Sequence, residues 1–244
     1  MSFVVNPYRF GGGAPPADFG LASRSFDGTD DYIEMGDVDG SIWQGAGGKM
    51  SVAMWVKGIP TGSGLLIGKY GALPAASQEW LFLARNDGDV EYVAYGASDG
   101  SSNVRERTDA AALTSEWVHV GATFDETEAD ADKIKVAVNG SFVATTNSLT
   151  GSNIVIQNST EDLCIGARDE GTGLQYNGKI ADARIYGTIL TESQFGDLAN
   201  GVNVGTPWGH WLLDTDDVTD YGTAGNDGHS TADSTFDTDG PLDP

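Results

Sequence analysis

The chain is poor in positive charge. Its 244 residues include 13 basic and 36 acidic residues, which gives a formal net charge of −23. This balance argues against a nucleic-acid partner, because phosphate binding needs a basic surface. It argues equally against an anionic membrane surface. An acidic exterior remains compatible with solubility, with cation binding, or with function in salty water.

Cysteine is scarce, long apolar runs are lacking, and we expect no export signal. Cys164 is the single cysteine, so no disulfide forms within the chain, and we expect it to be a small buried residue of a strand. No apolar run reaches the roughly 18 residues of a membrane-spanning helix, so we expect no membrane insertion. The start, MSFVVNPYRFGGG, has no basic region, apolar core or small-residue cleavage site.

What the chain does contain indicates an all-β fold. It has 34 glycines, and short apolar runs separated by Gly, Asn and Asp recur at the spacing of a β-sandwich. Six tryptophans are available for the core. We expect them to pack there, with one alternative: Trp43 lies in the glycine-rich stretch GSIWQGAGGK and is a candidate for an exposed stacking residue.

Residues 177–198, NGKIADARIYGTILTESQFGDL, are the most informative stretch. An Asn-Gly pair predicts a turn at 177–178, and the alternating run after it predicts a strand with both faces partly covered. A threonine N-cap then predicts a short amphipathic helix near 191–199, with Phe195 and Leu198 on its apolar side. A late strand followed by one short helix is unusual in a chain otherwise made of strands.

Five further segments occur in a fixed order along the chain. They are Ser25–Ile33 (SFDGTDDYI), Met50–Lys57 (MSVAMWVK), Glu116–Asp125 (EWVHVGATFD), Lys135–Ser141 (KVAVNGS) and Leu163–Gly166 (LCIG). Together with the closing strand and helix, they resemble the laminin G-like (concanavalin A-like) jelly-roll family over residues 23–200. The resemblance implies an all-β, two-sheet antiparallel jelly-roll sandwich. Such domains usually bind surfaces or glycans and only sometimes catalyse.

Residues 1–22 are predicted to form an extended anchoring arm. Its apolar residues precede a Gly-Gly-Gly-Ala-Pro-Pro spacer, which suits a segment that leaves the domain and docks elsewhere. The apolar residues are Phe3, Val4, Val5, Tyr8 and Phe10. The arm resembles the N-terminal segments of some tailed-phage virion proteins that carry laminin G-like domains. The alternative is that it adds an edge strand to its own sandwich.

Residues 201–244 form an acidic C-terminal segment. Its WGHWLLD and TDYGTAGNDG stretches resemble a segment that family members usually carry ahead of their first strand. We expect it to pack back on the sandwich, near the first strand, because some 40 residues cannot bury a separate core. The alternative is the beginning of a truncated second module.

Calcium is the one cofactor that the sequence suggests. Paired acidic residues recur, and carboxylate oxygens are ligands that Ca²⁺ prefers, although no stretch fits the EF-hand pattern. The family resemblance implies Asp27 and Asp182 as candidate Ca²⁺ ligands, on the first and the closing strand motif. This chain has Ala181 where the family commonly has an acidic residue. The alternative is that these carboxylates are solvated in turns.

Sugar binding requires an exposed aromatic ring beside polar groups, in loops or on the concave face. Trp43, Tyr70 and Tyr176 qualify by position, with a structural role as the alternative. Catalysis has little support. Retaining glycosidases of the wider fold carry an E-x-D-x-x-E cluster on one strand. Here Glu79 and Glu91 stand alone on their strands, so we expect no enzyme.

These observations favour a non-catalytic structural protein of a phage virion, such as a decoration, fibre or tail protein. It would attach to other virion proteins through its N-terminal arm, form a homo-oligomer and sometimes bind host-surface glycans. The alternative is a Ca²⁺-assisted carbohydrate-binding module, and a glycoside hydrolase ranks below both. The expected location is the virion surface of a protein made without a signal peptide; the alternative is extracellular.

Overall fold

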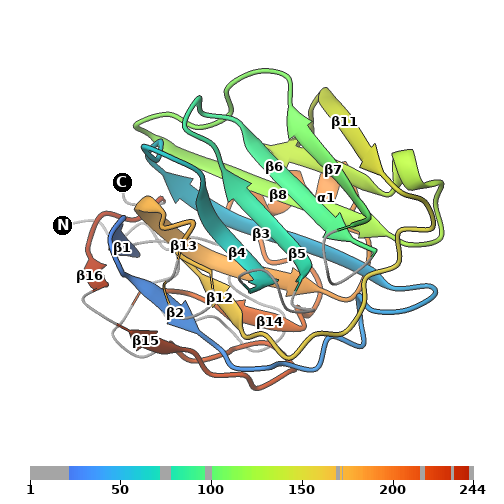
Figure 1. Ribbon diagram of the computed structural model, residues 1–244. Coiled ribbons are helices and arrows are strands. Elements are labelled where there is room, and N and C mark those ends of the chain that lie inside the picture. Colours follow the sequence, from blue (N-terminus) through green and yellow to red (C-terminus); the bar gives the residue numbers. More distant parts are fainter. Residues whose placement is uncertain are drawn as a thin grey trace.

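The protein is a sandwich of two antiparallel β-sheets, as predicted (Figure 1). The computed structural model describes residues 22–71, 78–96, 101–168, 171, 173–214, 218–231 and 234–241. The predicted arm residues Phe3, Val4, Val5, Tyr8 and Phe10 lie outside this part of the chain.

One sheet, called the back sheet, has the strand order β10-β9-β8-β3-β13-β1-β16, and β14 pairs with β13. Its strands are β1 (Ser23–Asp27), β3 (Lys49–Lys57), β8 (Trp117–Asp125), β9 (Ile134–Val138), β10 (Ser141–Phe142), β13 (Asn177–Tyr186), β14 (Gly209–Trp211) and β16 (Thr235–Asp237). At its centre, β3 and β8 pair over their full lengths, from Lys49 opposite Asp125 to Lys57 opposite Trp117.

The other sheet, called the front sheet, has the order β11-β7-β6-β5-β4-β12-β2-β15. Its strands are β2 (Tyr32–Glu34), β4 (Gly64–Tyr70), β5 (Gln78–Ala84), β6 (Val90–Tyr95), β7 (Asn103–Thr108), β11 (Thr145–Thr150), β12 (Leu163–Ile165) and β15 (His229–Thr231). A 3₁₀ turn, η1 (Asp130–Asp132), precedes β9.

The core between the sheets is filled by alternate residues of the strands. On β5, Trp80 and Phe82 point into this space, while Leu81 and Leu83 belong to a separate cluster on the opposite side of the sheet. This is the period-two pattern of strands. Both sides of the front sheet therefore carry buried apolar residues, and Cys164 is buried on the outer side, in line with the prediction.

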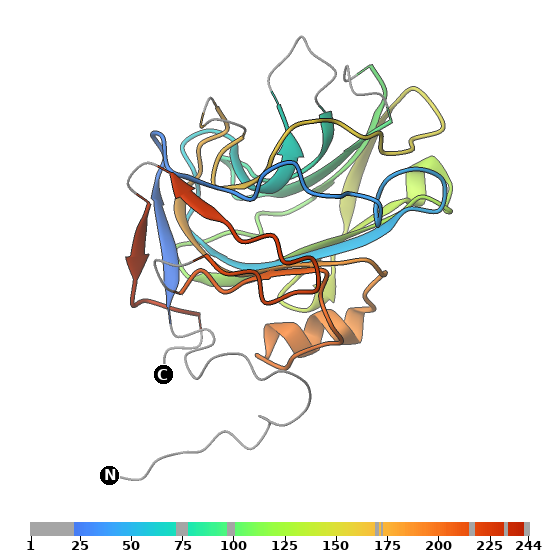
Figure 2. The ribbon, with the colours of Figure 1, turned by 90° about the horizontal axis from the view of Figure 1, so that it is seen from below.

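Helix α1 (Glu192–Ala199) lies against the back sheet, on the side away from the front sheet (Figure 2). Thr191 caps it as predicted, and Gln194 completes a capping box. Phe195 packs over Gly121, where an added Cβ would lie 2.4 Å from its ring, so only glycine fits below the helix. No helix in the part of the chain that the structure describes is long and apolar enough to cross a membrane.

The strand β13 departs from the simple alternation that the sequence predicts. Asn177 and Gly178 do not form a turn, because both are already paired with β1. The pairing of β13 with β3 shifts register between Ala181 and Arg184, and Asp182 there has a positive φ of 53°. This is the signature of a β-bulge, which re-aims the side chains that follow.

The C-terminal segment runs back along the sandwich. Strand β14 pairs with β13, β15 with β2, and β16 with β1. Beyond β16, the Asp239 carboxylate accepts hydrogen bonds from Lys57 Nζ at 2.9 Å, from Lys179 Nζ at 2.8 Å and from Trp117 Nε1 at 3.1 Å. These bonds hold the pKa of Asp239 well below its usual value, and they tie the end of the chain to three strands of the back sheet.

Candidate functional site

The outer side of the front sheet combines aromatic and polar side chains on neighbouring strands. Along β6, Glu91 and Tyr95 point to this side, and register places Asn103 opposite Tyr95 and Arg105 opposite Val93 on β7. Tyr70 reaches the same place from the end of β4. We call these five residues, Tyr70, Glu91, Tyr95, Asn103 and Arg105, the tyrosine–arginine face.

A buried apolar layer supports this face. The layer consists of Leu65, Leu81, Leu83, Val93, Tyr95 and Cys164, with Tyr32, Tyr70 and Leu174 packed against it. Side chains packed in this way lose little further freedom when a ligand arrives, so the polar groups above them are pre-organised.

The two tyrosine rings of the face lie together. Their centroids are 5.7 Å apart at an interplanar angle of 36°, and Tyr70 is the more exposed of the two. Gln78 Nε2 donates a hydrogen bond to the Tyr70 hydroxyl at 3.4 Å. Burial raises the pKa of Tyr95 far above its ordinary value, so its phenol keeps its proton at neutral pH. The pair thus offers ring surface together with hydroxyl groups.

Charged groups border the tyrosines. Arg105 donates from Nε and Nη2 to the side-chain oxygen of Asn103, at 3.3 and 3.2 Å. The buried Glu91 carboxylate lies between two guanidinium groups, 3.5 Å from Arg105 Nη1 and 3.3 Å from Arg85 Nη1. Guanidinium, amide and carboxylate groups can donate or accept hydrogen bonds with sugar hydroxyls, and an aromatic ring beside them offers an apolar contact surface.

A group of three aspartates lies where β1 leads into β2. Asp27, Asp30 and Asp31 bring one carboxylate oxygen each within 4.8 Å of one another. Asp31 accepts a hydrogen bond from the Asp27 amide at 2.8 Å, and Asn177 Nδ2 donates to the Asp27 carbonyl. Three hard oxygens at this spacing suit a cation of the Ca²⁺ type. Asp27 was predicted as a Ca²⁺ ligand from the sequence, whereas Asp30 and Asp31 were not.

Asp182 does not join this group, so its prediction as a Ca²⁺ ligand is wrong. Asp27 pairs with Asn177, and Asp182 lies five residues further along β13, on the order of 15 Å away. Its buried Oδ1 accepts hydrogen bonds from Arg184 Nε at 2.8 Å and from His210 Nε2 at 2.7 Å. A carboxylate already neutralised by a guanidinium group has little attraction left for a cation.

We expect Ca²⁺ to stabilise the protein through the aspartate triad. With a dissociation constant of about 10⁻⁴ M, about 10 mM Ca²⁺ would add about 2.7 kcal/mol to the free energy of unfolding. Thermal unfolding should show this as a rise of roughly 5–10 °C. Asp30→Asn should abolish the rise, whereas Asp197→Asn, which removes an exposed carboxylate of α1, should keep it. An equal rise in both variants would contradict the assignment.

Two of the three predicted sugar-binding aromatics are core residues. Trp43 is fully buried, and its Nε1 donates to Glu79 at 2.9 Å. Tyr176 is also fully buried, and its hydroxyl donates to the carbonyl oxygens of Lys57 and Gly58. Neither ring has a face to offer a ligand, which corrects both predictions. Tyr70 alone of the three lies on the tyrosine–arginine face.

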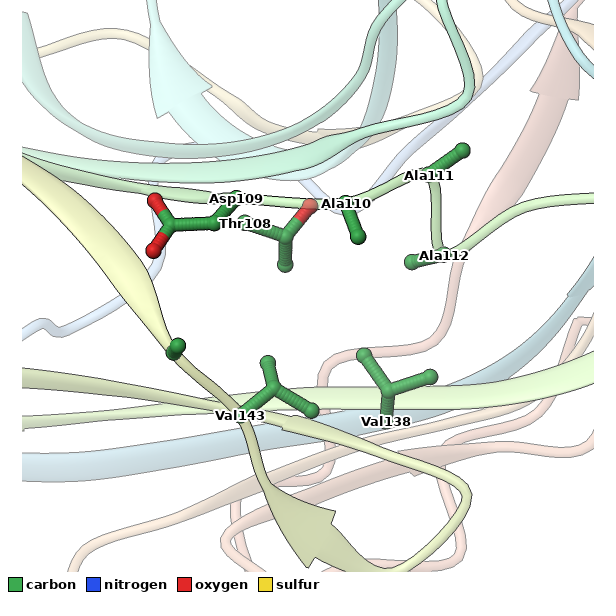
Figure 3. Close-up of a pocket in the computed structure, with 8 residues that line it drawn as sticks. Thr108, Asp109, Ala110, Ala111, Ala112, Val138 and Val143 are labelled. Carbon is green, nitrogen blue, oxygen red and sulfur yellow. The ribbon is translucent and has the colours of Figure 1, made fainter.

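A cavity of about 190 Å³ lies between the segment that follows β7 and the residues that flank β10. It is lined by Thr108, Asp109, Ala110, Ala111, Ala112, Val138, Val143 and Ala144. Val138 and Val143 point across it toward the facing alanine segment (Figure 3). Its walls are mostly methyl groups, and Asp109 already accepts a hydrogen bond from Thr146. This lining does not suit a sugar, which needs several converging polar groups.

The two-sheet topology is that of a concanavalin A-like β-sandwich. The chain belongs to the concanavalin A-like lectin/glucanases superfamily, because a model of that family, Laminin_G_3, matches residues 27–195. No curated protein sequence gives a significant match.

Solved structures with a similar fold are numerous. A native heptameric SAP-like pentraxin from Limulus polyphemus has a TM-score of 0.63 at 14% identity, covering 92% of this chain and 98% of that one. A putative carbohydrate binding protein from Bacteroides ovatus has a TM-score of 0.64 at 18% identity; the match covers 91% of this chain and 60% of that one. The Ruminococcus gnavus IT-sialidase CBM40 has 0.51 at 15% identity, with coverages of 72% and 96%. At these identities the likeness concerns the fold alone.

Proposed function

We propose that the protein is a non-catalytic carbohydrate-binding domain whose binding site is the tyrosine–arginine face. The observation that carries this proposal is the pairing of two tyrosine rings beside Arg105, Asn103 and Glu91 on one sheet face. It combines ring surface with fixed donors and acceptors, which is what sugar recognition requires. Two structures of the same fold are described as a putative carbohydrate binding protein and as the CBM40 of an IT-sialidase, which agrees with the proposal.

The absence of catalysis is part of the proposal and stays a prediction. Its support is that Glu79, one of the acids of the front sheet, is fully buried and accepts bonds from several donors. Attachment to a virion, a homo-oligomeric state and an extracellular location also stay predictions. The arm on which virion attachment depends lies outside the described residues.

Glycan binding can be tested with an array followed by calorimetric titration of the best ligands. Tyr70→Ala is expected to weaken binding by at least about tenfold, equal to about 1.4 kcal/mol. The matched control is Tyr221→Ala, because Tyr221 is 48% exposed but lies on the C-terminal segment beside His210. Titrations with Ca²⁺ and with EDTA would show whether the cation assists. No binding to any glycan at millimolar concentration would reject the proposal.

A further inference from the structure

Positive charge is scarce in this protein, and part of it is concentrated on the front sheet. The whole chain has 13 basic against 36 acidic residues. Arg85, Arg105 and Arg107 lie at the end of β5 and along β7, and their side chains are 32%, 40% and 35% exposed. Two other arginines, Arg24 and Arg184, are almost completely buried. An anion that reaches the outer side of the front sheet therefore meets accessible guanidinium groups.

Arg105 and Arg107 differ in the group to which each guanidinium group donates its hydrogen bonds. Arg107 donates from Nε to the Asp89 carboxylate at 2.7 Å and also contacts Asp87. Arg105 directs its Nε and Nη2 to Asn103, whose amide oxygen is uncharged, at 3.3 and 3.2 Å. These contacts are at the long end of the hydrogen-bond range. A carboxylate at the same edge would form two shorter, charge-assisted bonds in their place.

The surroundings of Arg105 keep a positive charge available. Glu91 is shared between Arg85 and Arg105, so two cations face one carboxylate. Glu91 is itself buried, with 5% of its side chain exposed, and is therefore placed to orient the guanidinium groups from below. The rings of Tyr70 and Tyr95 lie beside this group, since Tyr95 is opposite Asn103 in the sheet.

We propose that the tyrosine–arginine face recognises carboxylate-bearing sugars, with Arg105 as the bidentate partner of the sugar carboxylate. This inference rests on the proposed function and adds the chemical class of the ligand. The planar fork of arginine matches a planar carboxylate, which an ammonium group cannot do. Elsewhere the net charge of −23 repels an anionic glycan, so its recognition depends on this local group.

The experiment compares one oligosaccharide in two forms, a hexuronate oligomer and the same oligomer with its carboxyl groups reduced to alcohols. Wild-type protein is expected to bind the acidic form at least about tenfold more tightly, and salt should weaken this preference. Arg105→Gln should remove the preference, and Arg105→Lys should restore only part of it. A sulfated oligomer forms a further arm, which should bind less tightly than the hexuronate.

The matched control is Lys135→Gln, which also removes one positive charge. Lys135 lies on the back sheet, with its Nζ 5.7 Å from the Phe142 ring centroid, so the preference should survive this change. Equal affinity for the acidic and reduced oligomers, with Tyr70-dependent binding of both, would overturn the ligand class and leave the proposed function standing. If neither the acidic nor the reduced oligomer binds, and no neutral glycan binds either, the ligand class and the proposed function are both rejected. An equal loss in Lys135→Gln and Arg105→Gln would also reject the role of Arg105.

Discussion

Asp182→Asn is expected to lower the free energy of unfolding by about 3 kcal/mol, a large part of the roughly 5–15 kcal/mol typical of a domain. The Asp182 carboxylate is 3% exposed and is the ionic partner of the buried Arg184 and the hydrogen-bond partner of His210. Removing its charge leaves a buried guanidinium group uncompensated. Asparagine tolerates the positive φ of this position, so the loss reports charge and not backbone strain.

The pH dependence of this effect follows from the pKa of Asp182. Burial alone would raise this pKa, but the charge of Arg184 and the hydrogen bond of His210 outweigh burial and lower it. A lowered carboxyl pKa contributes stability that is complete above the unfolded value of about 4 and is lost as the pH falls through the folded value. The difference between wild type and Asp182→Asn should therefore be constant above about pH 5 and shrink in acid.

Urea unfolding at several pH values would measure both effects. Asp182→Asn combined with Arg184→Met is expected to recover at least about 1 kcal/mol, because it removes the unpaired charge. Asp197→Asn, on the exposed side of α1, serves as the control and should change stability by less than about 0.5 kcal/mol. A loss below about 1 kcal/mol in Asp182→Asn, with its unfolding still two-state, would refute the role of the buried ion pair.

Glu79→Ala is expected to cost about 4 kcal/mol of stability. The fully buried Glu79 carboxylate accepts bonds from Trp43 Nε1, from the amide and hydroxyl of Ser159, and from Lys69, whose Nζ is 2.8 Å away. Removing it leaves several buried donors without their acceptor. The carboxylate thus joins three segments that are far apart in the sequence, and its loss should loosen all three.

Near-ultraviolet circular dichroism and denaturant unfolding would measure the loss. The Trp43 ring packs edge-on against Trp80 and Trp208, with centroids 5.6 and 5.2 Å apart, so its signal reports the network. Trp43→Phe removes one donor and keeps an aromatic ring, and it should cost about half as much as Glu79→Ala. If the two variants cost the same, the bonds of Glu79 to Ser159 and Lys69 contribute nothing and the network interpretation fails.

Features that depend on neighbouring residues could be predicted from the sequence. Thr191 caps α1, and Phe195 and Leu198 are its buried residues, because capping and amphipathic spacing are local. The hairpin at Asn139-Gly140 joins β9 to β10 with positive φ at both residues, as an Asn-Gly turn between two strands requires. The order of the strand motifs along the chain was enough to predict the fold.

Features that depend on distant partners could not be predicted. The bulge at Asp182 breaks the alternation of β13, and the hydrogen bond from His210 to Asp182 comes from β14, a C-terminal strand with no local signal. The glycine-rich stretch around Trp43 suggests an exposed ring. In the structure the ring is buried, and its Nε1 donates a hydrogen bond to Glu79, 36 residues away. Asp30 and Asp31 were visible as a pair, but only the folded loop brings them to Asp27.

The sequence by itself determined a two-sheet sandwich with one short helix, since side-chain alternation, turn residues and caps act over a few neighbouring positions. The tertiary structure decided which polar and aromatic side chains meet. Tyr95 and Arg105 reach one face because β6 and β7 pair in a single register, and a shift of β7 by one residue would turn Arg105 to the opposite side of the sheet.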